Sequence, residues 1–378
     1  MDKIAGAVAS GREHFPVVIV GAGQAGLAAG YHLARARVPF VIFDANRRIG
    51  DSWRNRWGSL HLFTPARIDG LPGMHFPAGP NDLPSKDAMA DYLEVYADHF
   101  KLPVRSGVRV TALDVVDGGY VLTVDGRQVE ADQVIVATGA NQTPRIPAFA
   151  GELDPGIKQL SAGDYNHPSQ LKPGGVLVVG AGNSGAEIAL EAAKQHQTWL
   201  SGRSTGVGNP MVFSRPFWWL AMHILTNATP PGRKLVLKMS SEGAPLLRIR
   251  LEDLAAAGIE RVARTTGAEA GKPRLEDGHV LDVSNVVWCS GFRQDFEWIH
   301  LPVFDERGKP LHQRGVVTLQ RGLYFIGLPF LYGVTSALVG GVGRDAEFVT
   351  RQVLKWRAPR EAPAIRSHQP EDASAAAV

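Results

Sequence analysis

Short runs of β-branched and other apolar residues recur along the chain, and several lead directly into segments with helical character. The first run, Phe15–Val20, precedes a glycine turn, an Ala/Leu-rich segment reaching about Arg37 and a second apolar run at Phe40–Phe43. This order is typical of a βαβ unit, whose parallel strands are buried on both faces. It returns after about Pro173, where a helix is predicted over Gly185–Gln195. The pattern therefore predicts an α/β fold with two Rossmann-like dinucleotide-binding domains.

The segments around these units have other patterns. Lys86–Phe100 carries an apolar stripe with helical spacing, and Asp125-Gly126 is typical of a two-residue hairpin turn. Three runs predict a small antiparallel meander, namely Val108–Val115, Tyr120–Val124 and Gln128–Glu130. Further strands are expected at Gln133–Val136, Thr198–Leu200, Asn285–Trp288 and Leu323–Ile326, and a terminal helix at Ser336–Trp356. Residues 50–84 are rich in proline, glycine and aromatic residues, which predicts irregular structure.

The domain organisation follows from where these patterns stop. We expect residues 1–14 to be a flexible leader and residues 357–378 a disordered tail. Residues 15–160 and 289–356 are expected to form the first domain, with the second domain, residues 161–288, inserted into it. Residues 204–250 do not fit a lean βαβ unit and predict an insertion or lid. Four aromatic residues there form either the core of the insertion or the wall of an apolar substrate pocket; they are Phe213, Phe217, Trp218 and Trp219.

Composition narrows the class of protein. Hydrophobic residues make up 44% and charged residues 20% of the 378 residues, which suits a globular protein with a sizeable core. The net charge of +3 is small and the basic residues are scattered, which argues against a nucleic-acid partner. Cys289 is the single cysteine, so neither an internal disulfide nor a C-x-x-C redox pair exists. No apolar run has the length of a signal peptide or a membrane span, so we expect a cytoplasmic protein.

Each βαβ unit places a G-x-G-x-x-G motif after its first strand, at Gly21–Gly26 and at Gly180–Gly185. The first glycine permits the tight turn, the second lets a pyrophosphate approach the backbone, and the third lets helix and strand pack closely. The helix N-terminus then offers N–H groups and a positive dipole end to the phosphates. The copies differ 23 residues after the first glycine, where Asp44 stands in one and Arg203 in the other. An acidic residue there suits a ribose hydroxyl, and an arginine suits a 2′-phosphate.

The second motif has polar residues beside its arginine. Arg203 lies between Ser201 and Ser204, and together they offer charge-assisted hydrogen bonds to a 2′-phosphate. The alternative is that Arg203 is an ordinary exposed arginine in a turn. The sequence therefore favours NADPH over NADH without deciding between them.

Several further motifs are shared with one known family. They are Gly50-Asp51-Ser52-Trp53-Arg54, Ser59-Leu60-His61-Leu62-Phe63-Thr64, Leu71-Pro72-Gly73, Pro84-Ser85-Lys86, Ala137-Thr138-Gly139 with Pro144-Arg145-Ile146-Pro147, Ser290-Gly291-Phe292-Arg293, and Gly327-Leu328-Pro329 through Ser336-Ala337-Leu338 to Asp345-Ala346. With these motifs the chain resembles the flavin-dependent monooxygenases of the two-dinucleotide type, and especially their YUCCA-like branch. The resemblance covers most of the chain except residues 204–250, and it is more specific for fold and flavin than for substrate.

The resemblance implies FAD in the first domain and NADPH in the second. The residues expected at FAD are Gly21, Gly23, Gln24, Ala25, Gly26, Asp44, Ala45, Trp53, Arg54, Thr64, Val110, Ala137, Thr138, Gly139, Ser336, Ala337 and Leu338. Those expected at NADPH are Gly180, Gly182, Asn183, Ser184, Gly185, Ser201, Arg203, Ser204, Ser290 and Gly291. Core packing is the alternative role for Trp53, and a surface ion pair is the alternative for Arg54. The helix that follows Ser336–Leu338 is expected to direct its dipole toward the flavin.

The catalytic residues are not evident. The family's linker fingerprint is half present, because Gly163 and His167 stand while both of its aromatic positions are replaced. His167 is a weak catalytic candidate that is also compatible with a hinge or an ordinary polar loop. No His, Cys or carboxylate set has metal-ligand spacing, so no metal is expected.

The function implied by the resemblance is an NADPH- and O2-dependent FAD monooxygenase. NADPH would pass a hydride to FAD, and a peroxyflavin would then oxygenate a nitrogen, sulfur, carbonyl or α-keto centre of a small substrate. A flavin reductase or electron-transfer flavoprotein is the alternative, and a redox sensor with slow turnover is a third option. The oligomeric state is open, with a homodimer as one option.

Overall fold

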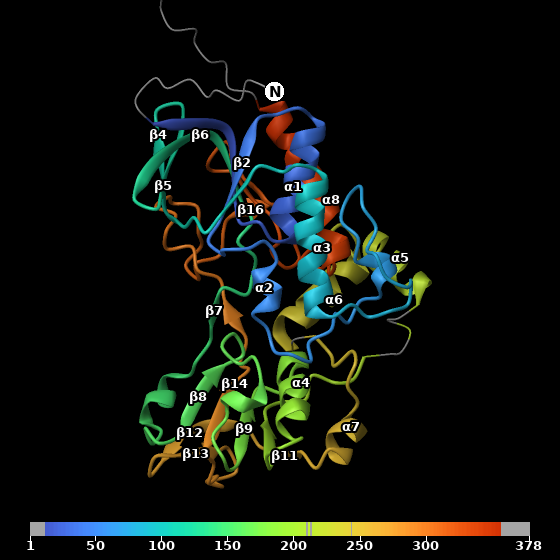
Figure 1. Cartoon of the computed structure of the whole chain (residues 1–378), viewed down its shortest axis with the longest axis vertical. Coiled ribbons are helices and arrows are strands. Elements are labelled where there is room, and N and C mark those ends of the chain that lie inside the picture. The colour runs from blue at the N-terminus through green and yellow to red at the C-terminus, as the bar shows by residue number, and fades with distance from the viewer. Residues whose placement is uncertain (1–11, 209–210, 212–213, 243, 357–378) are drawn as a thin grey trace, which may run out of the picture.

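Two α/β domains are stacked along the long axis of the molecule (Figure 1). The structure is a computed structural model that describes residues 12–208, 211, 214–242 and 244–356. The expected leader up to residue 11, the expected tail from residue 357 and Phe213 lie outside the described residues. His14 and Glu13, which were expected in the leader, already belong to strand β1.

The first domain is built on a nine-stranded sheet. Its centre is parallel: β1 (Glu13–Val20) lies between β2 (Phe40–Asp44) and β6 (Arg127–Val136), flanked by β3 (Val104–Ser106) and β18 (Leu323–Phe325). The edge is completed by β16 (His312–Gln313) and β17 (Val316–Val317), and β4 (Val110–Val116) and β5 (Gly119–Val124) extend from β6.

The two faces of this sheet have different covers. Helices α1 (Gln24–Arg35), α3 (Lys86–His99) and α8 (Val339–Lys355) gather on one face (Figure 1). Val17 and Ile19 of β1 pack into the core on that side, whereas Val18 and Val20 pack into a second core with residues of β4 and β5. This alternation is what a strand buried on both faces requires, and it explains why the run Val17–Val20 is apolar at every position.

The expected hairpin turn is confirmed. Asp125 and Gly126 connect β5 to β6, and both have positive φ, 46° and 77°. Two positive φ values match the right-handed twist of the flanking strands, which is why Asp-Gly is favoured there. The two expected strands Gln128–Glu130 and Gln133–Val136 are wrong as separate elements, because β1 pairs with β6 from Val129 to Val136 along a single strand.

The second domain has a parallel five-stranded sheet in the order β11-β10-β9-β14-β8. The strands are β8 (Lys158–Ser161), β9 (Val176–Val179), β10 (Thr198–Ser201), β11 (Glu260–Val262) and β14 (Asn285–Trp288). Helix α4 (Asn183–Ala192) follows β9, α7 (Leu251–Ala256) precedes β11, and β12 (Thr265–Glu269) pairs with β13 (Lys272–Leu275). All of these elements lie, in sequence, between β6 and β18 of the first sheet.

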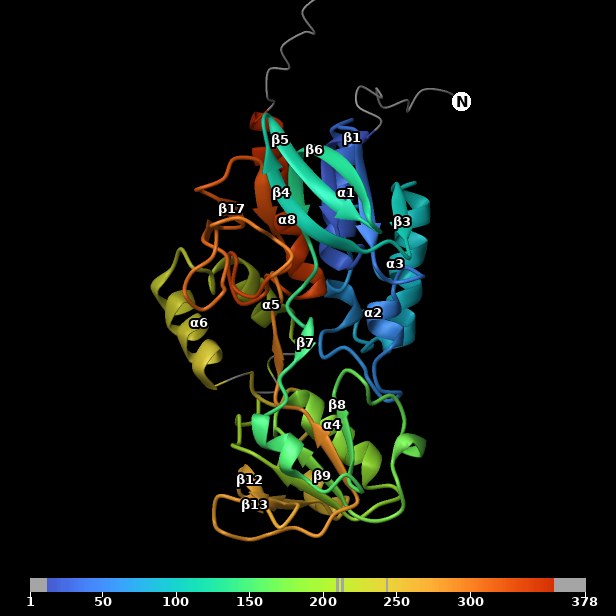
Figure 2. The same ribbon diagram turned by 90° about the vertical axis from the view of Figure 1, so that its left-hand side faces the viewer.

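The crossover lies earlier than the expected boundary at residue 160. Strand β8 belongs to the second sheet, and the outgoing and returning chains pair with each other as β7 (Thr143–Pro144) and β15 (Phe292–Arg293). Figure 2 shows these two strands running side by side between the domains. A strand that pairs only with a segment more than a hundred residues away leaves no local signal, which is why the boundary was misplaced.

The insertion of residues 204–250 interrupts the second domain in sequence, but it makes contacts with the first domain. It contains α5 (Arg215–His223) and α6 (Pro230–Glu242). Thr226 forms a β-bridge with Gly333, and the side chain of Arg344 on α8 donates to the Met222 carbonyl. The aromatic residues divide: Trp218 is buried and contacts Phe217, whereas Trp219 is 60% exposed.

Candidate active site

The first glycine turn has the geometry that nucleotide binding requires. Gly21 has φ of +109°, which favours glycine, and a Cβ atom on Gly26 would lie 1.8 Å from the Gly21 carbonyl oxygen. A Cβ atom on Gly23 would meet nothing within 4 Å. The outer glycines thus hold strand and helix together, while the middle one faces open space at the N-terminus of α1. No side chain caps this helix, so its N–H groups can receive an anion.

The second turn repeats this arrangement. Gly180 has φ of +117°, and a Cβ atom on Gly185 would lie 1.7 Å from the Gly180 carbonyl oxygen. A Cβ atom on Gly182 would again meet nothing within 4 Å, and α4 again lacks a side-chain cap. Both turns therefore form the same backbone cradle from different sequences.

A cavity of about 840 Å³ extends from the first turn toward the second domain. This volume suits a cofactor-sized ligand. The expected FAD residues that line it are Gly21, Gly23, Gln24, Ala25, Asp44, Ala45, Trp53, Val110, Ala137, Thr138, Gly139 and Ala337. From the second glycine motif only Ser184 reaches it. The structure thus brings most of the expected FAD residues together around one cavity, which also reaches the second glycine turn.

Asp44 is fixed at the edge of this cavity. Its carboxylate is buried, and its oxygens accept hydrogen bonds from the backbone N–H groups of Ala22 (2.6 Å) and Asn46 (2.7 Å). A carboxylate has about four acceptor positions, so it retains capacity for a ligand hydroxyl. The strand end and the glycine turn are therefore held in one arrangement by this side chain.

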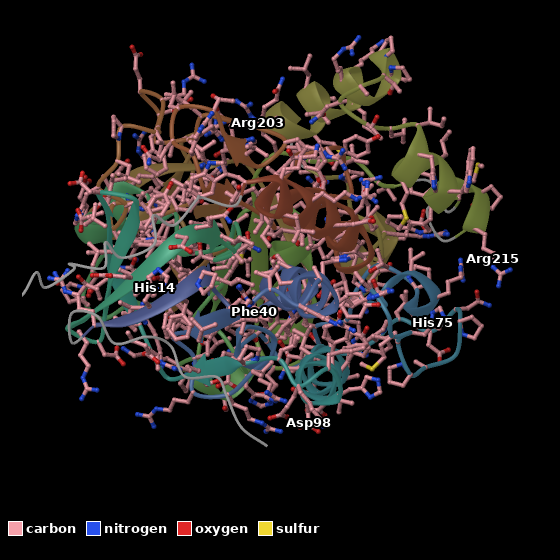
Figure 3. The ribbon with its side chains drawn as sticks, turned by 90° about the horizontal axis from the view of Figure 1, so that it is seen from above. His14, Phe40, His75, Asp98, Arg203 and Arg215 are labelled. Carbon is pink, nitrogen blue, oxygen red and sulfur yellow. The ribbon has the colours of Figure 1, made fainter. Side chains whose placement is uncertain are left out.

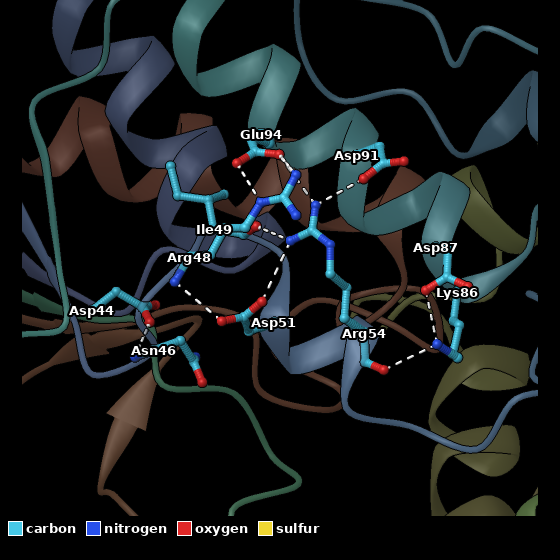
Figure 4. A network of polar contacts seen from close by, with 10 residues as sticks. All are labelled: Asp44, Asn46, Arg48, Ile49, Asp51, Arg54, Lys86, Asp87, Asp91 and Glu94. Carbon is cyan, nitrogen blue, oxygen red and sulfur yellow. Dashed lines mark hydrogen bonds and ion pairs between the residues drawn. The ribbon is translucent and has the colours of Figure 1, made fainter. Parts of the chain in front are cut away.

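Arg54 is not at the cavity, contrary to the expectation from the resemblance. Its guanidinium donates to the Ile49 carbonyl (2.6 Å) and forms ion pairs with Asp91 (2.8 Å) and Glu94 (3.2 Å) of α3 (Figure 4). The ion-pair alternative is thus the role that the structure shows. Trp53, its neighbour in α2 (Asp51–Arg54), lines the cavity and also packs against the first core.

Three other expected FAD residues lie behind the cavity wall. The Thr64 hydroxyl donates to Asp69 (2.5 Å), whose pKa burial raises to about 7. The Ser336 hydroxyl accepts from the backbone N–H groups of Tyr332 (2.9 Å) and Gly333 (3.1 Å). Leu338 is the N-cap residue of α8, which begins at Val339 rather than at Ser336. Ser336 and Leu338 therefore shape the turn that brings Ala337, not themselves, to the cavity.

Ser201, expected at NADPH, is engaged in contacts within the second domain. It is fully buried, and its hydroxyl donates to the Ala263 carbonyl (2.8 Å) and accepts from the Thr265 N–H (2.8 Å). By contrast, Arg203 and Ser204 are exposed. Two residues after the buried end of β10 the chain turns outward, so solvent and a ligand can reach Arg203 and Ser204.

The remaining expected NADPH residues form the second turn or lie beside it, and none of them lines the cavity. They are Gly180, Gly182, Asn183, Gly185, Ser290 and Gly291. The Asn183 amide joins the insertion, since it donates to the Pro245 carbonyl (2.9 Å) and accepts from the Leu247 N–H (3.0 Å). The Ser290 hydroxyl donates to the Arg145 carbonyl in the crossover. These two side chains fix neighbouring segments rather than point toward a ligand.

His167 caps a short 3-10 helix, η3 (Pro168–Gln170). Its Nδ1 accepts from the Ser169 N–H at 3.1 Å, and the side chain is exposed. It does not line the cavity, so the structure gives no support to the weak catalytic assignment.

Other residues line the cavity that the sequence analysis did not select. They include Asn46, Arg56, Trp57, Gln142, Asp295 and Trp298. Gln142 joins both domain connections, because its amide donates to Thr138 (2.8 Å) and Gly139 (2.8 Å) and accepts from the Asp295 N–H (2.9 Å). The sequence does place this polar residue just after the Ala137-Thr138-Gly139 turn, but no periodic pattern distinguishes it from other loop residues.

A half-buried carboxylate joins the two domains beside the cavity. Glu187 of α4 accepts from the Trp57 indole (3.1 Å) and pairs with Arg248 (3.1 Å), which also donates to the His61 carbonyl (3.1 Å). Burial raises the pKa of Glu187 to about 7, and the positive charge of Arg248 opposes this rise. The second turn and its helix are thus tied to the loop of residues 57–61 of the first domain.

Known proteins share both the sequence and the architecture. A family model described as pyridine nucleotide-disulphide oxidoreductase matches residues 18–225. A CzcO-like oxidoreductase of Geobacillus kaustophilus is 42% identical over 347 residues, covering 89% of this chain and 98% of that protein. The probable indole-3-pyruvate monooxygenase YUCCA7 of Arabidopsis thaliana is 30% identical over 319 residues, 74% of each chain. The solved flavin-containing monooxygenase from Stenotrophomonas maltophilia has a TM-score of 0.74 at 26% identity, over 91% of this chain and 99% of that one.

The chain belongs to the flavin-dependent monooxygenase family.

This flavin monooxygenase family member is an oxidoreductase, and its family pairs a flavin with a nicotinamide cofactor. Two cradles around one cavity fit that pairing. In the described part of the chain, no group of three or more His, Cys, Asp or Glu residues has the geometry of a metal site. Among the same residues, no helix combines the length and apolarity that crossing a membrane requires. Burial raises the pKa of the Cys289 thiol to about 12, so it is protonated at neutral pH.

Proposed function

We propose that the protein is an NADPH- and O2-dependent FAD monooxygenase. The observation that carries the proposal is the cavity of about 840 Å³, which begins at the open Gly23 and Asp44 and reaches Ser184 at the second cradle. One space in contact with both cradles suits two cofactors that exchange a hydride. FAD supplies the redox and oxygen chemistry when it is bound, and the residues described here bind, orient and shield it.

The first cradle fits FAD. Gly23 and the N-terminus of α1 would hold the pyrophosphate, and Asp44 would accept from a ribose hydroxyl. Trp53 and Ala337 lie where they would border the flavin ring, with α8 directing its positive dipole end toward the same space. Neither Arg54 nor Thr64 is needed in this arrangement.

The second cradle fits NADPH. The N-terminus of α4 at the open Gly182 would hold the pyrophosphate, and the exposed Arg203 would pair with a 2′-phosphate. Ser204 is exposed beside it, but its hydroxyl accepts from the Gly206 N–H (3.3 Å), so it is a weaker candidate. Ser201 has no role in this proposal.

The substrate is proposed as a small molecule with an α-keto, nitrogen or sulfur centre. The support for an α-keto acid comes from relatives such as YUCCA7, which is named as a probable indole-3-pyruvate monooxygenase. Arg56 and Trp57, at the domain junction, offer a cation and an indole to such a substrate from the cavity wall.

The test measures NADPH-dependent oxygen uptake by the purified protein in the presence of α-keto acids, amines and thioethers. The proposal expects uptake that one substrate class stimulates, with product formed in proportion and little hydrogen peroxide. Asp44→Ala should lower both flavin content and uptake, while Asp117→Ala, at an exposed turn far from the cavity, is the matched control. Fast reduction of an artificial acceptor with no oxygenated product would instead establish a reductase.

A further inference from the structure

Helix α5 presents large apolar side chains to solvent. Trp219 is 60% and Leu220 40% exposed, and Ile224, just after the helix, is 37% exposed. Trp218 and Ala221 on the opposite side are buried. The outward face of this helix therefore carries two large apolar side chains. An outward tryptophan and leucine on consecutive positions indicate a contact surface rather than scattered exposure.

This face is attached to the first domain by hydrogen bonds. Arg344 of α8 donates to the Met222 carbonyl, and Asn227 donates to the Phe330 carbonyl (2.5 Å). The rings of Trp219 and His223 stack with centroids 5.1 Å apart. The exposed tryptophan is thus pre-positioned on an anchored helix.

Basic residues predominate on the two helices of the insertion. Helices α5 and α6 carry one acidic residue, Glu242 at the end of α6, and four basic residues, in a chain whose net charge is only +3; they are Arg215, Arg233, Lys234 and Lys238. Arg215 lies on the same side of α5 as Trp219, four residues away, and Figure 3 shows its side chain reaching outward at the edge of the molecule. Arg233 and Lys234 are exposed on α6, beside Leu237, which is 72% exposed.

We infer that α5 and α6 dock the protein onto an anionic lipid membrane surface. Tryptophan and leucine bordered by Arg and Lys are the side chains that enter the headgroup region, where an indole is half immersed and cations meet lipid phosphates. A second copy of the same face is disfavoured, because a two-fold contact would bring the arginine and lysine side chains of both copies together. The inference does not depend on the proposed function, since the face lies outside the cavity.

The experiment is cosedimentation of the full-length protein with lipid vesicles. One set contains phosphatidylcholine alone, and the other contains phosphatidylcholine with phosphatidylglycerol. We expect binding to be at least about tenfold stronger with phosphatidylglycerol and to weaken with salt. Trp219→Ser with Leu220→Ser should weaken it about tenfold, and Arg233→Glu with Lys234→Glu should remove the preference for anionic vesicles.

Matched control variants distinguish loss of the α5 and α6 surface from general effects of lower surface hydrophobicity or charge. Leu319→Ser removes an apolar side chain that is 65% exposed elsewhere, and Lys101→Glu with Arg127→Glu reverses two exposed charges far from α5. Both should leave vesicle binding unchanged. Thermal melting and flavin content report whether each variant still folds, which is expected because all these side chains are exposed.

Three outcomes would overturn the inference. The first is equal binding to both vesicles, or to neither. The second is a concentration-dependent dimer that Trp219→Ser dissolves, which would make the face a contact between copies. The third is binding to polyglutamate but not to vesicles, which would indicate an acidic protein partner.

Discussion

The two glycine turns are nearly the same in backbone geometry and differ in the side chain at the next strand end. In both, the third glycine lies against the carbonyl of the first, and the middle glycine faces open space. Asp44 is buried and accepts one hydrogen bond from Ala22 of the first turn and one from Asn46 after its own strand, whereas Arg203 is exposed beside the second turn. We propose that both cradles are anion sites of one kind, and that the side chain at the next strand end selects the dinucleotide.

The difference also suggests unequal lifetimes of the two ligands. The first cradle opens into the cavity and is braced by Asp44, which suits a cofactor that stays bound. The second touches that cavity only through Ser184 and offers its arginine from the surface, which suits a cofactor that exchanges in each turnover.

The largest expected effect comes from the third glycines. Gly26→Ala and Gly185→Ala would each place a methyl group within 2 Å of a backbone carbonyl oxygen. Backbone cannot yield as a side chain can, so we expect a loss of about 3 kcal/mol or more in unfolding free energy and poor expression. Denaturant unfolding measures it. If either variant were as stable as the wild type, the close helix–strand contact assigned to that turn would be wrong.

The middle glycines should separate folding from binding. Gly23→Ala and Gly182→Ala introduce a methyl group into open space at ordinary negative φ (−74° and −81°), so both variants should fold normally. Gly23→Ala should weaken flavin retention by tenfold or more, about 1.4 kcal/mol, because the methyl group keeps the pyrophosphate from the backbone. Gly182→Ala should keep its flavin and raise the KM for NADPH instead. Absorbance spectra report the flavin content of each variant, and steady-state kinetics report its KM for NADPH. If Gly182→Ala lost flavin and Gly23→Ala raised the KM instead, the assignment of the two cofactors to the two turns would have to be exchanged.

Arg203→Ala tests the side chain that distinguishes the second turn. Loss of a charge-assisted contact should raise the KM for NADPH about ten- to a hundredfold and leave that for NADH nearly unchanged. Arg274→Ala, at an exposed arginine on β13, is the matched control and should change neither value. Equal changes in the KM for both nucleotides would contradict the proposed contact between Arg203 and the 2′-phosphate.

The last prediction concerns the helices that follow the two glycine turns. Helix α1 packs against α3 and α8 of its own domain, whereas α4 presents Glu187 to the other domain. The folded-state pKa of Glu187, about 7, lies above its ordinary value of about 4.3, so the folded protein binds the extra proton between those pH values. Stability from this group is therefore present below about pH 4.3 and is lost as the pH rises through about 7.

Glu187→Gln should abolish this loss. Between pH 5 and pH 8, the wild type should lose on the order of 1–3 kcal/mol relative to the variant. Denaturant unfolding at both pH values measures the difference, with Glu152→Gln, at an exposed carboxylate of the same domain, as the control. A difference that stays constant with pH would contradict the half-buried, proton-sensitive contact.

Local patterns account for the parts of the fold that could be predicted. A buried parallel strand such as Val176–Val179 is apolar at every position, and Asp125-Gly126 favours positive φ at two positions, so each is visible within a few residues. Strand β8 and the pairing of β7 with β15 could not be predicted, because they depend on partners more than a hundred residues away.

The candidate site divides in the same way. The glycines and Asp44 could be selected because backbone geometry and strand ends constrain them. Arg54 and Ser201 were selected from motifs that fix the position of the backbone, while the direction of each side chain is set by ion pairs to α3 and by the Thr265 hydrogen bond. Gln142 was missed because a crossover has no periodicity.

The central claim is that the first turn holds FAD and the second delivers NADPH to it across one cavity. Anaerobic mixing of the purified protein with increasing NADPH, while the flavin absorbance is followed, tests this most directly. The account predicts one bound FAD per chain, reduced at a rate that saturates with NADPH, and at least about tenfold more NADPH for half-saturation in Arg203→Ala. Absence of bound flavin, or a bound flavin that NADPH does not reduce, would contradict it.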